Sequence, residues 1–448
     1  MERRSPAARV APVMRGRVPT APAGLRRTTP APAVPVPAAL AVLLLVAALA
    51  ACATGEPIDE PDFTLTVGEE AVAVASPMLR SGMNYGNWMI VYQLLDRYEP
   101  LDIPLLRYPA GNYGDDNLLT GHALERFVRS ADWLDAEPMV QHNLLMGDPE
   151  EAARWVRFAQ EEELRIGYWF IGNEPDRYAI RGQPQWTPEY YAEMFREYAA
   201  AIRAVDPEAR IVGPAVTGTP NLEWMEAFLR GAGDVVDVLA WQWYPTDGTA
   251  DRDEALASAV EVREHIELFR SLAGDPEYNP DGWEREIPMF ISEFGLSWRT
   301  SHGRLLTDMT AAIWLAEVWA EMVIAELEYA AYFALQGTGG HGLFDSGHFV
   351  RPTYFATRFV AEMPERWHPV EIDAPRADLV AYAARGEGGT TELLLLNKRE
   401  EPVTVAIPEA RGTVRAQSVS DAEQDEPVET RFRGGVELPP YSITRAVY

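Results

Sequence analysis

Two short apolar stretches of this 448-residue chain each carry a glutamate near their end. One stretch spans 169–175 and contains Glu174, and the other spans 289–295 and contains Glu293. Apolar runs of this length, bounded by Gly or Pro, are typical of buried parallel strands. A carboxylate at the end of a buried strand costs free energy unless it is paired or put to use. The two glutamates therefore suggest a paired-carboxylate active site, the arrangement that glycoside hydrolysis needs.

The elements that would position this pair alternate between strand and helix. Apolar runs predict eight strands, at 79–84, 105–108, 139–143, 168–173, 211–214, 236–244, 289–293 and 329–336. The clearest amphipathic helical patterns between them cover 150–162, 188–205, 253–273 and 307–326. This alternation indicates an α/β fold, a (β/α)8 TIM barrel, with a doubly wound sheet as the alternative.

The spacing of the two glutamates fits such a barrel. Glu174 and Glu293 are 119 residues apart. If they end the fourth and seventh strands, three strand–helix units of about 40 residues fit between them. The carboxyl ends of barrel strands share one face, so both side chains would open into the same cleft.

The pattern changes after the expected barrel, which we place at 64–369. Helical periodicity disappears, and short β-like runs follow at 379–384, 392–397, 403–407, 413–418 and 443–448. Residues 370–448 are therefore expected to form a small C-terminal antiparallel β-sandwich domain. Residues 63–74, before the first barrel strand, are a candidate additional strand of that domain.

The sequence around both glutamates resembles clan A glycoside hydrolases. The resemblance rests on Gly172-Asn173-Glu174-Pro175 at the end of a fourth strand and on 292–295, Ser-Glu-Phe-Gly, at the end of a seventh. It implies a retaining mechanism in which Glu174 is the acid/base and Glu293 is the nucleophile that forms a covalent glycosyl-enzyme. It also implies that Asn173 hydrogen-bonds the sugar 2-hydroxyl.

Two further motifs resemble the barrel families of arabinofuranosidases, xylosidases, heparanase-like enzymes and endoglucanases. The run 106–112 resembles the second-strand motif whose Arg, here Arg107, lies beside the nucleophile and favours its charged form. The run 243–245 resembles the sixth-strand motif in which a tyrosine hydroxyl, here that of Tyr244, contacts the nucleophile. Several related families have a His where this chain has Gln242, which hydrogen-bonds but does not titrate.

Other candidate substrate-binding residues are Trp298, Asn143 and Gln336. Trp298, five residues after Glu293, is the best candidate for stacking on a sugar ring, with simple packing as the alternative. Asn143 and Gln336 each end an expected strand. Asp115 and Asp116 suit calcium or, more simply, a solvated loop. The histidines show no metal-ligand spacing, so no metal and no cofactor is expected.

The first 52 residues resemble a bacterial lipoprotein signal peptide. An apolar segment at 39–48 is followed by Leu49-Ala50-Ala51-Cys52, and Cys52 is the only cysteine in the chain. We expect lipidation of Cys52, a tether at 53–63, and an exported cell-envelope lipoprotein on the outer surface or in the periplasm, anchored to the membrane by its lipid. Without residues 1–52 the net charge is −35, which argues against nucleic acid as a partner.

Two classes of function remain open. The first is a retaining O-glycoside hydrolase whose partner is a carbohydrate substrate: an arabinofuranosidase-like exo-enzyme, a xylosidase- or glucuronidase-like exo-enzyme, or an endo-glycanase. The second is a carbohydrate-binding lipoprotein that keeps the barrel without catalysis. The presence of both carboxylates favours the first class.

Overall fold

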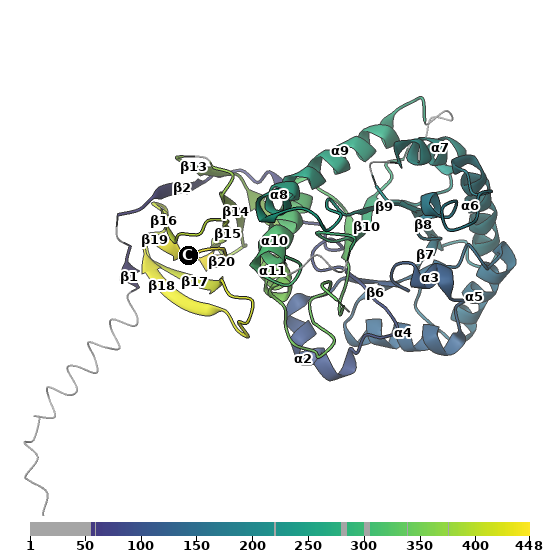
Figure 1. The fold of residues 1–448 in the computed structure, drawn as a ribbon, viewed down its shortest axis with the longest axis horizontal. Helices are drawn as coiled ribbons and strands as arrows, with labels where there is room; N and C mark the ends of the chain where they lie inside the picture. Colours follow the sequence, from purple (N-terminus) through teal and green to yellow (C-terminus); the bar gives the residue numbers. More distant parts are fainter. Residues whose placement is uncertain are drawn as a thin grey trace, which may run out of the picture. The chain divides into compact units, whose positions relative to one another are not determined.

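The computed structural model describes residues 55–58, 60–218, 221–278, 285–299, 305–337, 339–374 and 376–448. Eight parallel strands close into a barrel (Figure 1). In chain order the barrel strands are β4 (Met83–Asn84), β5 (Leu105–Tyr108), β6 (Glu137–His142), β7 (Tyr168–Ile171), β8 (Arg210–Val216), β9 (Val238–Trp243), β10 (Met289–Phe294) and β11 (Tyr329–Tyr332). Each pairs with its chain neighbours and β11 closes on β4, so the predicted barrel is confirmed.

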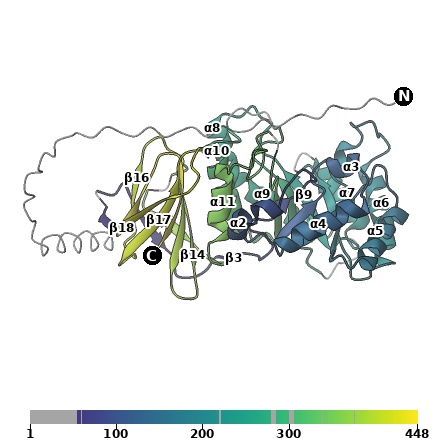
Figure 2. The same ribbon diagram turned by 90° about the horizontal axis from the view of Figure 1, so that it is seen from below.

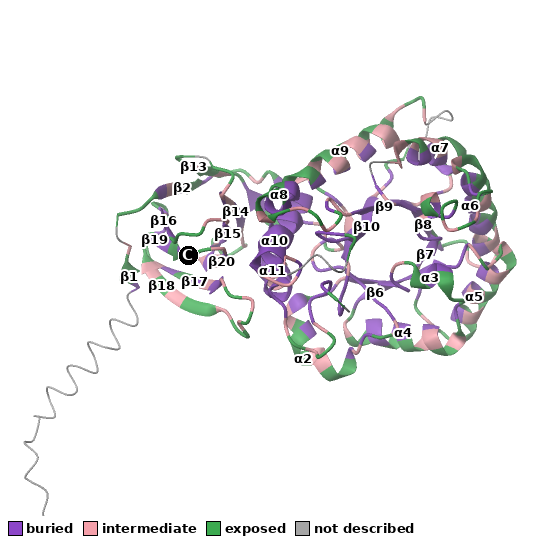
Figure 3. Cartoon of the chain, viewed as in Figure 1, coloured by how far each residue is buried: buried purple, intermediate pink, exposed green. Residues whose placement is uncertain are grey.

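Burial on both faces explains why these strands are apolar runs and not alternating patterns. Every residue of β5, β7, β9 and β10 is buried (Figure 3). One set of side chains fills the barrel interior, including Met139, Phe170, Val212 and Phe290. The other set packs outward against the helices. The interior is thus a packed core, and chemistry is confined to the strand ends and the loops.

The helices surround the barrel and begin with polar caps. Thr120, Asp148, Thr187 and Asp308 each accept a hydrogen bond from a backbone N–H in the first turn of a helix. The expected helix at 253–273 is divided into three pieces, because a short 3₁₀ turn separates two α-helices. The helices are α2 (Leu95–Tyr98), α3 (Tyr113–Asp116), α4 (Gly121–Trp133), α5 (Pro149–Glu161), α6 (Pro188–Arg203), α7 (Leu222–Ala232), α8 (Arg252–Ala257), α9 (Glu261–Gly274), α10 (Met309–Ile324) and α11 (Pro352–Ala361), with 3₁₀ turns η1 (Tyr92–Leu94), η2 (Glu99–Leu101), η3 (Pro175–Arg177) and η5 (Ser258–Val260).

Two sheets with their own apolar core follow the barrel. One sheet has the order β1-β18-β17-β20-β15-β14-β12-β3 and the other has the order β13-β2-β16-β19. Residues 63–74 supply β2 and β3, and Glu56–Pro57, within the expected tether, pairs with β18. The strands are β1 (Glu56–Pro57), β2 (Phe63–Val67), β3 (Ala73–Val74), β12 (Arg366–His368), β13 (Val370–Ile372), β14 (Leu379–Arg385), β15 (Thr391–Asn397), β16 (Val403–Ala406), β17 (Thr413–Val419), β18 (Val428–Arg433), β19 (Gly435–Leu438) and β20 (Ser442–Val447).

Helix α10 is buried on nearly its whole circumference because it is covered from two sides. It packs on α11 and also contacts β15 and β20, and in both ribbon views α10 and α11 stand between the barrel strands and the β domain (Figures 1 and 2). Two of its glutamates are buried there. Glu317 Oε2 lies 2.6 Å from Nζ of Lys398, and Glu321 accepts a hydrogen bond from Tyr382. These contacts tie the β domain to the barrel.

The expected lipidation residue Cys52 lies outside the described residues, together with the whole expected signal peptide and positions 53, 54 and 59 of the expected tether. Within the described part of the chain, no helix combines the length and apolar character that crossing a bilayer requires.

Candidate active site

The positions of Glu174 and Glu293 are set by the carboxyl ends of their barrel strands. Glu293 is the fifth residue of β10, the seventh barrel strand, and is 6% exposed. Glu174 comes three residues after β7, the fourth strand, and its backbone N–H donates to the carbonyl of Ala215. Gly172 makes this turn possible, since its φ is +79° and an added Cβ would lie 3.0 Å from the Tyr178 hydroxyl. Glu174 itself has φ 46°, a left-handed conformation that costs a non-glycine residue about 1–2 kcal/mol.

Arg107 is the centre of the hydrogen-bond network that surrounds Glu293. The guanidinium is fully buried and donates to Glu293 Oε2 at 3.0 Å. Its other hydrogen bonds run to side-chain oxygens of Asn84 (2.9 Å), Asn173 (2.6 Å) and Gln141 (3.3 Å). The two Nη atoms of this buried cation are thus bonded to one carboxylate and three amide oxygens, whereas its buried Nε has no partner among the described residues.

Tyr244 completes the surroundings of Glu293 from the other side. Its hydroxyl donates to Glu293 Oε1 at 2.8 Å. Burial, and then the negative charge of Glu293, raise the pKa of Tyr244 well above its ordinary value. The phenol therefore stays protonated and acts as a donor, so both carboxylate oxygens of Glu293 are held in place.

Glu174 has a different environment. Within the described residues its carboxyl group has no hydrogen-bond or ion-pair partner. Burial, followed by the nearby charges of Glu293 and Asp176, raises the pKa of Glu174 to about 8. A carboxyl group that holds its proton at neutral pH, beside a paired carboxylate, is the division of roles that acid catalysis requires.

Asn173 and Gln242 are buried polar residues next to the two glutamates, since Asn173 precedes Glu174 and Gln242 of β9 is paired with Glu293 of β10. Asn173 Oδ1 accepts hydrogen bonds from Arg107 and from Gln242 Nε2 (2.8 Å). An arginine only donates, so these contacts fix the orientation of the Asn173 amide. Asn173 Nδ2 and Gln242 Oε1 are buried without a protein partner, which leaves one donor and one acceptor for a ligand.

The other predicted binding residues contact loop residues in this structure. Asn143 donates to the backbone carbonyls of Asp115 and Asn117 and accepts from the Met146 N–H. Gln336 bonds the Ile90 N–H and the Asp345 carbonyl, and it is buried. Trp298 is exposed, and the guanidinium of Arg299 lies 4.6 Å over its ring. The structure thus brings Glu174, Glu293, Asn173, Arg107, Tyr244 and Gln242 together, and it gives Asn143 and Gln336 bonds to backbone groups.

Several residues of this network were not predicted from the sequence. Asn84 and Gln141 bond Arg107, and both are polar residues inside expected apolar strands, a signal that could have found them. The expectation of a solvated loop at Asp115 is wrong: it is 1% exposed and accepts hydrogen bonds from Tyr178 (2.8 Å) and Arg181 (3.0 Å). Burial raises the pKa of Asp115 to about 7. No local pattern marks it, because Tyr178 and Arg181 come from a distant part of the chain.

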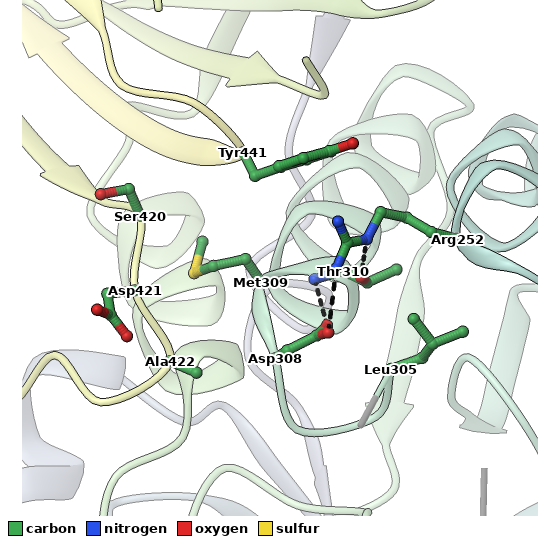
Figure 4. Close-up of a pocket in the computed structure, with 9 residues that line it drawn as sticks. All are labelled: Arg252, Leu305, Asp308, Met309, Thr310, Ser420, Asp421, Ala422 and Tyr441. Carbon is green, nitrogen blue, oxygen red and sulfur yellow. Dashed lines mark hydrogen bonds and ion pairs between the residues drawn. The ribbon is translucent and has the colours of Figure 1, made fainter. Parts of the chain in front are cut away.

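A separate cleft of about 470 Å³ is lined by residues of α8, α10 and the β domain (Figure 4). Two of its charged groups pair with each other, since Arg252 contacts Asp308. Arg252 also donates to Thr310 Oγ1, and its guanidinium lies 4.5 Å over the Tyr441 ring. Neither Glu174 nor Glu293 lines this cleft. We therefore place the chemistry at the strand ends and not here.

Comparison with known proteins finds arabinofuranosidases among the relatives of this chain. An intracellular exo-alpha-L-arabinofuranosidase of Bacteroides ovatus is 20% identical over 257 residues, which cover 46% of this chain and 48% of that protein. An intracellular exo-alpha-(1->5)-L-arabinofuranosidase of Streptomyces lividans is 30% identical over 151 residues, 30% of this chain and 22% of that protein. The matches thus span about half the length of the first relative and less of the second.

Solved structures of low sequence identity share the fold. The alpha-L-arabinofuranosidase of Thermotoga maritima in its arabinose complex has a TM-score of 0.69 at 16% identity, covering 86% of this chain and 100% of that one. A family 51 alpha-L-arabinofuranosidase of Bifidobacterium longum has a TM-score of 0.70 at 17% identity, covering 87% of this chain and 100% of that one. A family 44 xyloglucanase of Paenibacillus polymyxa has a TM-score of 0.63 at 11% identity, covering 86% of this chain and 99% of that one.

The C-terminal domain has a family match of its own. Residues 376–446 match the D-apionate lactonase C-terminal immunoglobulin-like domain. The expected resemblance to arabinofuranosidase-like barrels followed by a β domain is therefore confirmed.

Proposed function

We propose that this chain is a retaining glycoside hydrolase that cleaves O-glycosidic bonds of an oligo- or polysaccharide. The observation that carries the proposal is the contrast between its two glutamates. Glu293 is held by Arg107 and Tyr244, whereas burial raises the pKa of Glu174 to about 8. One carboxylate that attacks and one carboxylic acid that protonates are the two groups that double displacement requires.

The proposed reaction has two steps. In the first, Glu293 attacks the anomeric carbon while Glu174 gives its proton to the glycosidic oxygen, so that the carbon–oxygen bond breaks and an alcohol leaves. In the second, the Glu174 carboxylate takes a proton from water, whose oxygen displaces Glu293 from the sugar. Asn173 Nδ2, free of protein partners, donates to a sugar hydroxyl beside the anomeric carbon.

We propose an L-arabinofuranoside as the first substrate to test, because the curated relatives are named arabinofuranosidases. Gln242 replaces the His of several related families, and its free Oε1 accepts a hydrogen bond from the substrate. This position is where the sugar preference of the chain is expected to differ from theirs.

The test is a panel of 4-nitrophenyl glycosides (α-L-arabinofuranoside, β-D-xyloside, β-D-glucuronide), followed by arabinan, xylan and xyloglucan. Glu293→Gln and Glu174→Gln should each lose at least about 10²-fold in turnover of the polysaccharide that is cleaved. Glu137→Gln is the matched control, since Glu137 begins β6 at the opposite end of the barrel. Full activity of Glu293→Gln refutes the proposal.

A second measurement separates catalysis from sugar binding alone. An activated 2-deoxy-2-fluoro glycoside should release a burst of leaving group equal to the enzyme and label Glu293 covalently. A chain that binds the panel sugars but releases no burst and cleaves nothing would be the non-catalytic carbohydrate-binding protein.

We also propose export and lipidation of Cys52, supported by the apolar segment 39–48 and the Leu-Ala-Ala-Cys sequence that ends at this residue. Labelled palmitate should enter the native chain and not Cys52→Ser. Equal labelling of the two would refute the anchor.

A further inference from the structure

Two exposed aromatic residues lie on neighbouring loops at the carboxyl end of the barrel. Trp88 follows β4 and Tyr113 follows β5, and they are 40% and 37% exposed. Their ring centroids are 6.2 Å apart and the rings meet edge to face. Exposed aromatic rings of this size are costly in water, and a pair of them at the mouth of a barrel is what binds the apolar face of a sugar.

Both rings are held in place rather than free to rotate. The Trp88 indole N–H donates to the carbonyl of Gln336, 3.1 Å away in the loop after β11. The Tyr113 hydroxyl accepts from Asn87 Nδ2 at 3.2 Å. Asn87 Oδ1 in turn accepts from Arg126 and Tyr108, which fixes its orientation. Because the polar atoms of both side chains are already hydrogen-bonded, a ligand that binds to the ring faces causes little further loss of side-chain conformational entropy.

The pair lies close to the candidate nucleophile. A Cβ built on Gly111 would be 3.8 Å from Glu293 Oε2, and Tyr113 is two residues farther along the chain. Two residues span at most about 7 Å, roughly the length of one sugar ring. The strands β11, β4 and β5, whose loops hold the pair, are consecutive in the barrel, and β10 with Glu293 comes next.

Within the described ranges, the other exposed tryptophans do not combine these features. The ring of Trp298 already has Arg299 over it. Trp133, 43% exposed and packed on Tyr92, is the last residue of α4. Since α4 starts after the carboxyl end of β5, its last residue lies toward the amino end of the barrel, away from the glutamates.

We propose that Trp88 and Tyr113 form an aromatic platform for a sugar ring other than the one that Glu293 attacks. Glu293 is 6% exposed, whereas Trp88 and Tyr113 are 40% and 37% exposed, so we assign the carboxylate and the platform to successive sugar rings. This inference rests on the proposed function and extends it: the substrate has at least two sugar units, and its second ring contributes to affinity.

The test is affinity electrophoresis of the full chain with Glu293→Gln, in gels that contain arabinan, xylan or xyloglucan. At least one glycan should retard it. Adding Trp88→Ala should weaken that binding about tenfold, the loss expected of a buried aromatic contact. Trp88→Phe keeps a ring but loses the bond to Gln336, so it should retain most of the affinity. Adding Trp133→Ala should change binding less than about twofold.

Retardation that is unchanged by Trp88→Ala, or no retardation in any of the three gels, overturns the platform. Loss of binding with Trp88→Phe equal to that with Trp88→Ala also overturns it, because the loop contact and not the ring would then be responsible. Hydrolysis by the unmodified chain is measured separately. A chain that cleaves nothing but binds through Trp88 would refute the hydrolase alone, and a chain that cleaves without Trp88-dependent binding would refute the platform alone.

Discussion

The protonation of Glu174 gives the sharpest prediction. Burial is the main reason that the pKa of Glu174 is raised from 4.5 to about 8, and the charges of Glu293 and Asp176 add to it. At pH 7 about nine in ten molecules then carry the acid proton, against about one in three hundred at the ordinary pKa. A raised pKa therefore makes the chain competent as an acid at neutral pH, and kcat/KM should fall about tenfold per pH unit above pH 8.

The assay compares two leaving groups in the native chain and in Glu174→Gln. With a sugar leaving group, which needs protonation, the variant should lose about 10²–10⁴-fold in kcat/KM. With a 2,4-dinitrophenolate leaving group, which needs none, the loss in the glycosylation step should be far smaller. In Glu174→Gln the decline above pH 8 should disappear. Equal losses for the two leaving groups, or a decline above pH 8 that survives in Glu174→Gln, would refute the assignment.

The same pKa predicts an effect on stability that does not depend on catalysis. The native state binds more protons than the unfolded state between pH 4.5 and about 8, so the free energy of unfolding falls as pH rises through that window. Ionising Glu174 costs at most about 5 kcal/mol at pH 9. Glu174→Gln should therefore be more stable than the native chain at pH 9 and equal to it at pH 4, measured by chemical denaturation. A variant equally stable at both pH values would contradict the raised pKa.

Two further substitutions test the network around Glu293, and a third tests the contact between α10 and the β domain. Arg107→Met leaves Glu293 buried without its cation. The free energy of unfolding, measured in urea, should fall by about 3–5 kcal/mol. A loss under about 1 kcal/mol would show that water replaces the guanidinium. Tyr244→Phe removes the 2.8 Å bond to Glu293 and should lower kcat about 10- to 100-fold with the thermal midpoint nearly unchanged; unchanged kcat would exclude the contact from the reaction. Lys398→Ala should lower the free energy of unfolding by about 3 kcal/mol because it leaves Glu317 unpaired. Adding Glu317→Gln to that variant should restore most of the lost stability. If it restores none, the lysine acts through packing.

The barrel was predictable from the sequence because its strands are buried on both faces. A run such as Trp169-Phe170-Ile171 leaves no polar side for water, and eight such runs alternate with helices. The missed strand β18 shows the converse. Its residues, Val-Glu-Thr-Arg-Phe-Arg, are exposed or half-buried throughout, so the sequence lacks an apolar signal and pairing with β17 and β1 makes it a strand.

Part of the candidate site was likewise predictable and part was not. Glu174, Glu293 and Arg107 stand in local motifs. The role of Asp115 depends on Tyr178 and Arg181, more than 60 residues away, so no pattern around Asp115 separates it from its solvated neighbour Asp116. Asn143 and Gln336 stay predictions as substrate-binding residues. The end of a strand faces the loops as well as the cleft, and in this structure both amides bond backbone groups.

Arg107 connects the two motifs into one chemical unit. Its guanidinium bonds Glu293 through Nη1 and Asn173 through Nη2, so one planar group sets the positions of the attacking carboxylate and of the neighbouring amide. Because the guanidinium can only donate, Asn173 must present its oxygen to Arg107 and its NH₂ group to the cleft. Gln242 donates to the same oxygen, which leaves its own Oε1 without a partner among the described residues. A lysine at 107 would supply the charge but not both bonds, so the Asn173 donor would lose its orientation. In the proposed reaction the arginine therefore matters for the orientation of the Asn173 donor as much as for holding the Glu293 carboxylate.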